Sequence, residues 1–228
     1  MTPNCQFHAD AQTMAVAAAA LIERRIREVL RRREDCVLAV AGGTTPLPTY
    51  RRLIESDIDW ACVHLIQTDE RMTPDPAQRY GTALASAFDL TDTADAARPR
   101  WHPIPHGNPF EVAGLYAEQI ARLPRPDIVV LGLGADGHTA AIFEPDIPVC
   151  TQTVLATTRD DEDRVTLSQD HLHAIPTRIL LATGSGKKAA VTQLLTPADS
   201  AARTSAALVL DENGYLFADF AAQPAALA

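Results

Sequence analysis

A histidine close to a carboxylate in a glycine-rich segment is the feature of this sequence best suited to chemistry. The segment Gly132-Leu133-Gly134-Ala135-Asp136-Gly137-His138-Thr139 follows a short apolar run. A carboxylate beside an imidazole fixes the tautomer of the ring and raises its basicity, which is what a general base needs. We therefore expect His138 to act as a general base and Asp136 to be its partner.

The same segment also satisfies the pattern G-x-G-x-x-G, which is typical of dinucleotide-binding folds. Two observations argue against that interpretation. The match lies late in the chain rather than on its first strand, and His138 stands where the helix that cradles a phosphate normally begins with a small apolar residue. A general-base site is the better interpretation.

A second candidate segment, Gly42-Gly43-Thr44-Thr45-Pro46, lies between an expected strand and an expected helix. Its two glycines let the backbone approach an anion, and its two hydroxyls add hydrogen-bond donors. Pro46 suits the first turn of a helix, whose N-terminus attracts phosphate. A tight turn followed by a helix cap would produce the same residues. Gly42, Gly43, Thr44 and Thr45 are candidate phosphate ligands.

Two cations could add to such a phosphate site. Arg164 lies in the run Arg-Val-Thr-Leu, and Lys187 ends the run Gly184-Ser185-Gly186-Lys187. A P-loop would need glycine at position 181 and serine or threonine at position 188, where the chain has Leu181 and Lys188, so an NTPase is not expected. Arg164 and Lys187 are candidate phosphate cations, with solvated surface charges as the alternative.

A charged cluster, Thr68-Asp69-Glu70-Arg71, follows another apolar run. Charges gathered at the carboxyl end of a strand are typical of a functional site, although a surface salt-bridge cluster would have the same composition. We expect Asp69 and Arg71 to contribute to the site.

Strand-like and helix-like segments alternate along the chain, which predicts an α/β fold with one doubly wound, mainly parallel sheet flanked by helices. Ligands then bind beyond the carboxyl ends of the strands. We expect a single domain over residues 1–228, with surface connections at Thr91–Asn108 and Glu144–Pro148. The expected strands lie at 36–43, 61–68, Ile128–Gly134 and Arg178–Gly184, and the expected helices at Ala11–Arg33, Leu47–Ile54, Tyr80–Phe88, Glu111–Leu123 and Lys187–Leu195.

Composition excludes several classes of partner. The 228 residues carry a formal net charge of −9 with a pI near 5.2, so a basic surface for nucleic acid or an anionic membrane is not expected. The four cysteines show no C-x-x-C spacing, and neither a disulfide framework nor a metal site is expected. No signal-peptide or membrane-spanning pattern is present, which predicts a cytoplasmic protein.

The candidate segments taken in order resemble the 6-phosphogluconolactonase family over nearly the whole chain. The segments that carry the resemblance are AGGTTP, TDERM, LGLGADGHTAAIF, RVTLS, TGSGKKAAV and a closing FADFA. That family shares its fold with glucosamine-6-phosphate deaminases. Arg71 favours the lactonases, because deaminases usually carry an aromatic residue there. Deaminases also place a catalytic glutamate five residues after the histidine, where this chain has Phe143, with Glu144 one residue late.

The chain departs from the pattern of the lactonase family at two places. Gln78-Arg79 precedes Tyr80-Gly81 where the family usually has Ser-Asn, and Glu144 separates Phe143 from a proline where the family has Phe-Pro. A guanidinium at Arg79 could make a bidentate contact with phosphate or with the carboxylate of the product. The alternative is a helix arginine that faces solvent.

The resemblance implies hydrolysis of 6-phosphogluconolactone, the second step of the oxidative pentose phosphate pathway, with neither metal nor cofactor. It implies that His138 activates water and Asp136 orients the imidazole. It further implies that Gly43, Thr44, Thr45, Arg164 and Lys187 hold the phosphate while Asp69 and Arg71 shape the sugar end. A deaminase or isomerase of amino sugar phosphates and a non-catalytic sugar-phosphate-binding regulator are the alternatives. The expected partner is a phosphorylated sugar lactone, bound by a monomer or a small homo-oligomer.

Overall fold

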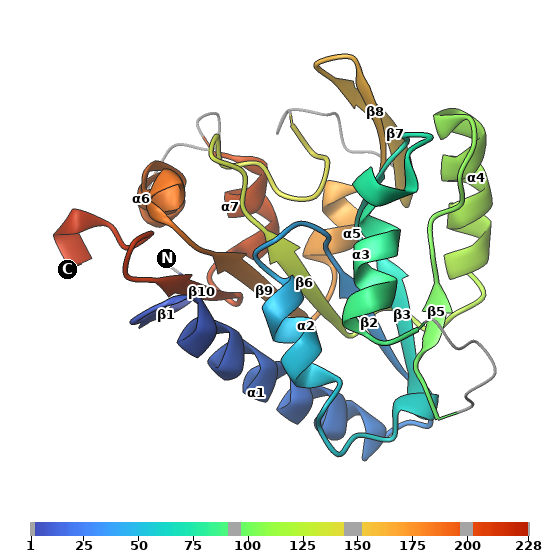
Figure 1. Ribbon diagram of the computed structural model, residues 1–228, viewed down its shortest axis with the longest axis horizontal. Coiled ribbons are helices and arrows are strands. Elements are labelled where there is room, and N and C mark those ends of the chain that lie inside the picture. The colour runs from blue at the N-terminus through green and yellow to red at the C-terminus, as the bar shows by residue number, and fades with distance from the viewer. Residues whose placement is uncertain (1–2, 91–96, 144–151, 197–202, 228) are drawn as a thin grey trace.

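The computed structural model describes residues 3–90, 97–143, 152–196 and 203–227, and Figure 1 shows helices on both sides of a central sheet. All neighbouring strands of this seven-stranded sheet run parallel, in the order β1-β10-β9-β6-β2-β3-β5. The expected α/β class and its mainly parallel sheet are confirmed. The strands are β1 (Asn4–His8), β2 (Cys36–Val40), β3 (Val63–Gln67), β5 (Arg100–His102), β6 (Ile128–Gly132), β9 (Thr177–Ala182) and β10 (Tyr215–Asp219).

The strand order reverses between β2 and β6. From β2 the chain continues to β3 and β5 on one side, whereas from β6 it continues to β9 and β10 on the other. These two strands pair directly, through Leu38 with Ile128 and Val40 with Val130. The loops that leave their carboxyl ends therefore diverge and open a crevice, the usual position of a ligand in such sheets.

Each face of the sheet has its own hydrophobic core, and the alternation of side chains along the strands explains this division. In β2, which is buried along its whole length, Val37 and Ala39 join one cluster while Leu38 and Val40 join the other. Helices α1, α2 and α3 pack on the second cluster, and α4 to α7 on the first. The helices are α1 (Ala11–Leu30), α2 (Leu47–Leu53), α3 (Tyr80–Ala87), α4 (Pro109–Ile120), α5 (Gln169–His173), α6 (Lys188–Leu195) and α7 (Ser205–Leu210).

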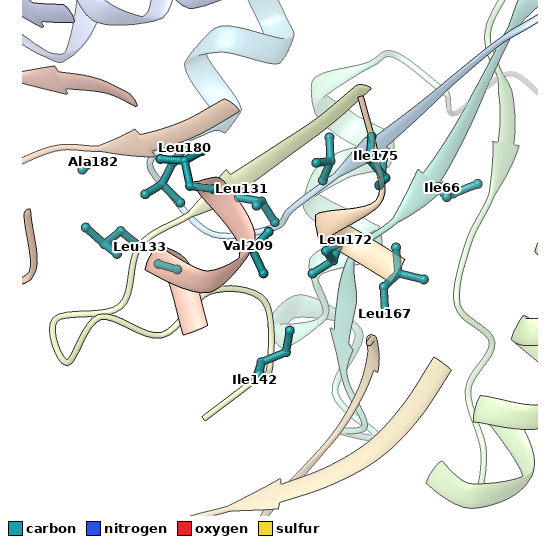
Figure 2. Close-up of a cluster of buried hydrophobic side chains, with 14 of the residues drawn as sticks. Ile66, Leu131, Leu133, Ile142, Leu167, Leu172, Ile175, Leu180, Ala182 and Val209 are labelled. Carbon is teal, nitrogen blue, oxygen red and sulfur yellow. The ribbon is translucent and has the colours of Figure 1, made fainter. Parts of the chain in front are cut away.

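The first core cluster reaches the segment that follows His138. Figure 2 shows Ile142 near Val209 of α7 and below Leu131 of β6 in the same cluster. The Ile142 side chain is only 1% exposed. Burial of an isoleucine side chain stabilises a fold by roughly 1.5–3 kcal/mol. The burial of Ile142 therefore holds the segment after His138 against the core of the sheet.

A second, three-stranded antiparallel sheet was not expected. Its order is β4-β8-β7, with β4 at Asp69–Arg71, β7 at Val154–Arg159 and β8 at Glu162–Leu167. The register pairs Asp69 with Thr166 and Arg71 with Arg164. Two segments that the sequence offered as separate candidates are therefore joined backbone to backbone.

Most expected elements appear with shorter bounds, and some strands were missed. The first helix ends at Leu30, three residues before Arg33, and begins with a capping box between Asp10 and Thr13. Strands β1 and β10 pair with each other at one side of the sheet, but β1 is short and largely polar, so its periodicity was too weak to detect. The connection at Thr91–Asn108 contains β5, and Glu144–Pro148 lies outside the described residues.

The helices of the described residues are those of a protein without a bilayer-crossing helix in that part of the chain. None of the helices there combines the length and the apolar composition that a bilayer crossing requires.

Two stacked histidines join β3 to the edge strand β5. His64 Nδ1 lies 2.9 Å from His102 Nε2, and the ring centroids are 5.1 Å apart. Burial lowers the pKa of both imidazoles, and the neighbouring Arg100 lowers both further. Asp35 partly opposes this shift at His64. One ring must donate to the other, so at least one imidazole of the pair must be neutral.

We expect this pair to make the fold sensitive to mild acid. A lowered pKa in the folded state means that the unfolded chain takes up protons first, so stability is present above the unfolded value of about 6.5 and is lost as pH falls below it. Urea unfolding at pH 7.5 and 5.5 should show a larger loss of stability in the wild type than in His102→Asn. Equal losses in both proteins would contradict this prediction.

Candidate active site

A cavity of about 320 Å³ lies at the carboxyl ends of β2 and β6, where the strand order reverses. It brings together seven of the residues singled out from the sequence. These are Gly42, Gly43, Thr44, Thr45, Asp69, His138 and Lys187. Four separate loops or strand ends contribute them, and no stretch of local sequence could have formed this site alone.

His138 faces this cavity and is held from behind by Asp136. Asp136 Oδ1 lies 2.5 Å from His138 Nδ1 and 3.3 Å from the backbone nitrogen of the same residue. When Nδ1 donates to the carboxylate, Nε2 carries the lone pair. The ring of Phe143 packs edge-on against the imidazole, with centroids 4.9 Å apart. The arrangement suits a general base whose tautomer is fixed.

Arg159, at the end of β7, binds the other oxygen of the same carboxylate. Its Nη1 donates to Asp136 Oδ2 over 2.6 Å. Partial burial raises the pKa of Asp136, but the hydrogen bonds from Arg159 and His138 outweigh this and hold it well below its usual range. Asp136 is therefore ionised throughout the physiological pH range, and it can accept from His138 at any pH at which the protein works.

The loop that carries this pair is fixed by glycine and by α7. A Cβ on Gly134 would lie 2.2 Å from His138 Nδ1, so only glycine leaves room for the ring. The backbone nitrogen of Thr139 donates to Ser205 Oγ over 3.1 Å, and Ser205 Oγ donates to the carbonyl of Ile142 over 2.7 Å. Ala140, which lines the cavity, has a φ of 50°, a left-handed conformation that costs energy for a non-glycine residue.

The glycine-threonine loop after β2 forms the opposite wall of the cavity. Gly43 has a φ of 89°, and a Cβ on Gly42 would meet the ring of Tyr80 at 2.2 Å. Thr45 Oγ1 lies 3.1 Å from Thr183 Oγ1, which joins this loop to the one after β9. The two glycines therefore allow the backbone to turn and Tyr80 to approach.

Lys187 reaches the cavity from the loop after β9. The backbone nitrogen of Gly184 in that loop donates to both carboxylate oxygens of Asp219 over 3.0 Å. Asp219 also accepts from the backbone nitrogen of Ala222 over 2.9 Å, and its side chain is buried at the end of β10. The closing segment of the chain thus sets the position of the lysine loop.

Asp69 is a buried carboxyl group on the cavity wall. Burial raises its pKa to about 6, opposed by the hydrogen bond that Thr68 Oγ1 donates over 2.7 Å and by Arg164, and reinforced by Glu70. The nearest cation contact is Arg164 Nη1, 4.0 Å from Asp69 Oδ2. A carboxyl group with this pKa can take up or release a proton near neutral pH.

The three candidate arginines do not line the cavity. Arg164 lies directly behind it and donates to Tyr80 Oη over 3.0 Å, while Arg71 donates to Glu162 Oε1 over 2.6 Å. Glu162 also accepts from Arg164 Nε over 3.1 Å, so one carboxylate joins both cations. The structure brings Arg71 and Arg164 together on adjacent strands, one layer away from the cavity surface.

Arg79 lies farther away. Its Nη2 donates to the carbonyls of Ile104 and Pro105 over 2.7 and 3.2 Å, and its Nε lies 3.5 Å from the buried Glu70. The side chain is 13% exposed, so it neither faces solvent nor enters the cavity. Here Arg79 ties the start of α3 to the loop after β5.

Glu70 explains why this neighbourhood is rigid. Its carboxylate is fully buried and accepts from the backbone nitrogens of Arg71, Tyr80 and Gly81, each over 2.7 Å. It therefore caps the beginning of α3 and places Tyr80 against Gly42.

Within the part of the chain that the structure describes, no group of three or more histidine, cysteine, aspartate or glutamate side chains is arranged to hold a metal ion.

Comparison with known proteins assigns this chain to a family. Residues 9–218 match the family model described as glucosamine-6-phosphate isomerases/6-phosphogluconolactonase. A 6-phosphogluconolactonase of Rhizobium meliloti is 30% identical over 214 residues, which cover 88% of this chain and 91% of that protein. The chain belongs to this family.

Solved structures extend the comparison. The 6-phosphogluconolactonase of Trypanosoma brucei superposes with a TM-score of 0.81 at 26% identity, covering 96% of each chain. A monomeric glucosamine-6-phosphate deaminase gives the same TM-score at 20% identity, covering 99% of this chain and 100% of that one, and this likeness concerns the fold alone. The family fold is therefore common to both activities.

Sequence reasoning missed several residues of this family site. Tyr80, Thr139 and Ala140 line the cavity, and Arg159 binds the histidine's partner. The sequence signal that could have found Arg159 is the pair Asp160-Asp161, which can form a hairpin turn. In the structure this pair separates Arg159 from Glu162 at the ends of two paired strands. Aspartate is among the residues that favour tight hairpin turns, but the pair Asp-Asp is a weaker sign than Asn-Gly.

Gly134→Ala tests the packing of the histidine loop. The added methyl group should displace the imidazole and break the Asp136–His138 hydrogen bond, because both side chains lie within 3 Å of its ideal position. The ¹H–¹⁵N spectrum of the imidazole should lose the hydrogen-bonded Nδ1–H signal. The matched control is Gly114→Ala in α4, where a Cβ meets nothing within 4 Å. An unchanged signal in Gly134→Ala would show that the loop has more room than the structure implies.

Proposed function

We propose that this chain hydrolyses 6-phospho-D-glucono-1,5-lactone to 6-phospho-D-gluconate, with His138 as the general base. The observation that carries the proposal is the shared cavity, in which an oriented imidazole faces a glycine-threonine loop and a lysine. The relatives that bear the name 6-phosphogluconolactonase support the same activity.

The proposed reaction begins with proton transfer from water to His138 Nε2. The resulting hydroxide adds to the C1 carbonyl of the lactone and forms a tetrahedral intermediate. This intermediate then collapses, the C1–O5 bond breaks, and the ring oxygen recovers the proton from His138. Because Asp136 binds Nδ1 throughout, Nε2 is the nitrogen that takes up the proton in the first transfer and returns it in the second.

Phosphate binding is assigned to the other side of the cavity. Lys187 supplies a positive charge, and the Gly42–Thr45 loop supplies backbone and hydroxyl donors to an anion. Asp69 lies on the cavity wall near Tyr80 and is placed to contact sugar hydroxyls. Arg71 and Arg164 act indirectly in this proposal, through Glu162 and Tyr80. Arg79 has a structural role in this proposal, because it joins the start of α3 to the loop after β5.

The alternative function, deamination of an amino sugar phosphate, uses the same fold. Lactone hydrolysis is preferred because the residue five positions after His138 is Phe143, whose ring packs on the imidazole and offers no carboxylate. A parallel assay for ammonia release from glucosamine 6-phosphate separates the two activities. Ammonia release without lactone hydrolysis would overturn the proposal.

His138→Ala should lower kcat for lactone hydrolysis by about 10²–10⁴-fold, the usual contribution of a positioned general base. The measurement is a coupled assay with freshly generated lactone, corrected for spontaneous opening. His173→Ala is the matched control, since that histidine lies in α5 with its side chain 50% exposed. Turnover near that of the wild type in His138→Ala would remove this residue from the mechanism.

Lys187→Ala should raise KM for the phosphorylated lactone by about 10–100-fold, the range of a hydrogen bond between charged groups. Turnover of unphosphorylated gluconolactone should change little, because that substrate has no anion to lose. Lys188→Ala is the matched control, since the neighbouring lysine is exposed and is not among the residues that line this cavity. Equal losses on both substrates would show that Lys187 is not a phosphate ligand.

A further inference from the structure

A tight hairpin delivers Arg159 to the histidine loop. Strands β7 and β8 pair from Val154 with Leu167 to Arg159 with Glu162, which leaves a two-residue turn. The turn residues, Asp160 and Asp161, have φ values of 51° and 59°. Positive φ at both central positions is the pattern of a type I′ turn, whose twist matches that of the strands it joins. The position of Arg159 is thereby fixed by backbone pairing.

The guanidinium of Arg159 contacts three groups of the proposed catalytic loop. Nη1 lies 2.6 Å from Asp136 Oδ2 and 3.5 Å from His138 Nδ1, and the guanidinium carbon lies 4.8 Å from the centroid of Phe143. The same aromatic ring packs edge-on against His138. Arginine, carboxylate, imidazole and phenyl ring thus form one connected cluster.

We propose that Arg159 is a positioning residue that holds Asp136 in the orientation that fixes the tautomer of His138. This inference rests on the proposed function, because it assigns a role within the same reaction. Arg159 is not among the residues that line the cavity, so it acts through Asp136 rather than on the substrate.

The need for such a residue follows from the exposure of the carboxylate. The side chain of Asp136 is 42% exposed, and an aspartate bound only by His138 could rotate and exchange its partner for water. Arg159 occupies Oδ2 and leaves Oδ1 to the ring and backbone nitrogens of His138. Misplacement of a catalytic group by about 1 Å can cost 10²-fold in rate, so loss of this anchor should appear in kcat.

Arg159 also adds a positive charge beside the base. The charged groups that face His138 are Asp136 in its own loop, Arg159 from β7, and Asp69 and Lys187 across the cavity. Asp160 lies 3.7 Å from Arg159 Nε and is almost fully exposed. Without Arg159, the charge of Asp136 would act on the imidazole unopposed and favour its protonated form.

The test compares Arg159→Gln with Arg159→Lys. Arg159→Gln removes the charge and should lower kcat about 10–100-fold, because a misplaced catalytic group can lose up to about 10²-fold in rate, while KM stays within about twofold. The acid limb of the pH profile of kcat/KM should move to higher pH. Arg159→Lys keeps the charge, so it should keep the acid limb in place and restore part of kcat.

Arg52→Gln is the matched control, because Arg52 also binds a carboxylate, that of Glu55, over 2.8 Å but lies in α2. It should leave kcat, KM and the pH profile unchanged. A rise of KM alone in Arg159→Gln, with an unchanged pH profile, would make Arg159 a substrate ligand and overturn the inference. Wild-type kinetics in Arg159→Gln would overturn it as well.

A measurement without substrate separates this inference from the proposed function. ¹H–¹⁵N spectra of the imidazoles, assigned with His138→Ala, report the tautomer of His138 and its titration. In Arg159→Gln the Nδ1–H form should lose its dominance and the ring should titrate at higher pH, whether or not the protein hydrolyses the lactone. A tautomer and titration identical to the wild type would overturn the inference. An inactive wild type with the expected spectra would overturn only the function.

Discussion

The direct pairing of β2 with β6 is the constraint on which the rest of the site depends. Because the strand order reverses there, the two loops diverge from adjacent strand ends and leave a cavity of about 320 Å³ between them. The loop after β2 supplies the glycines and threonines, and the loop after β6 supplies His138. The paired residues of both strands are buried, so the pairing is also a rigid support for groups that must be placed accurately.

The three-stranded sheet adds a second layer of control around that cavity. Its strands carry Asp69 on the cavity wall, the Arg71–Glu162–Arg164 cluster behind it, and Arg159 at the tip of the hairpin. Antiparallel pairing fixes the register of all three strands. A change in the register of β8 would therefore displace Glu162 and Arg164 relative to the charged residues of both neighbouring strands. The arginines around the site are therefore placed by one structural unit that is separate from the main sheet, whereas Lys187 is placed by the loop after β9.

The fold does not choose between the two activities of its family. A deaminase superposes on this chain as closely as a lactonase does, with the same TM-score of 0.81. Function is decided by side chains rather than by the fold. In the proposed site, Phe143 packs on the imidazole of His138, and Arg159 binds Asp136. These two side chains contact each other, so the character of the site depends on their joint packing.

The sequence by itself determined the mainly parallel sheet and the segments that reach the cavity. Apolar runs followed by glycine or polar residues are local signals, and Gly42, Asp69, His138 and Lys187 each come after one. Tertiary structure alone decided which charged side chains reach the cavity. Arg79 donates to backbone carbonyls and Arg159 donates to Asp136. The sequence did not reveal either contact, because the partners lie far away along the chain. Hydrogen-bond partners are set by packing and strand register, and neither is encoded in a short window of residues.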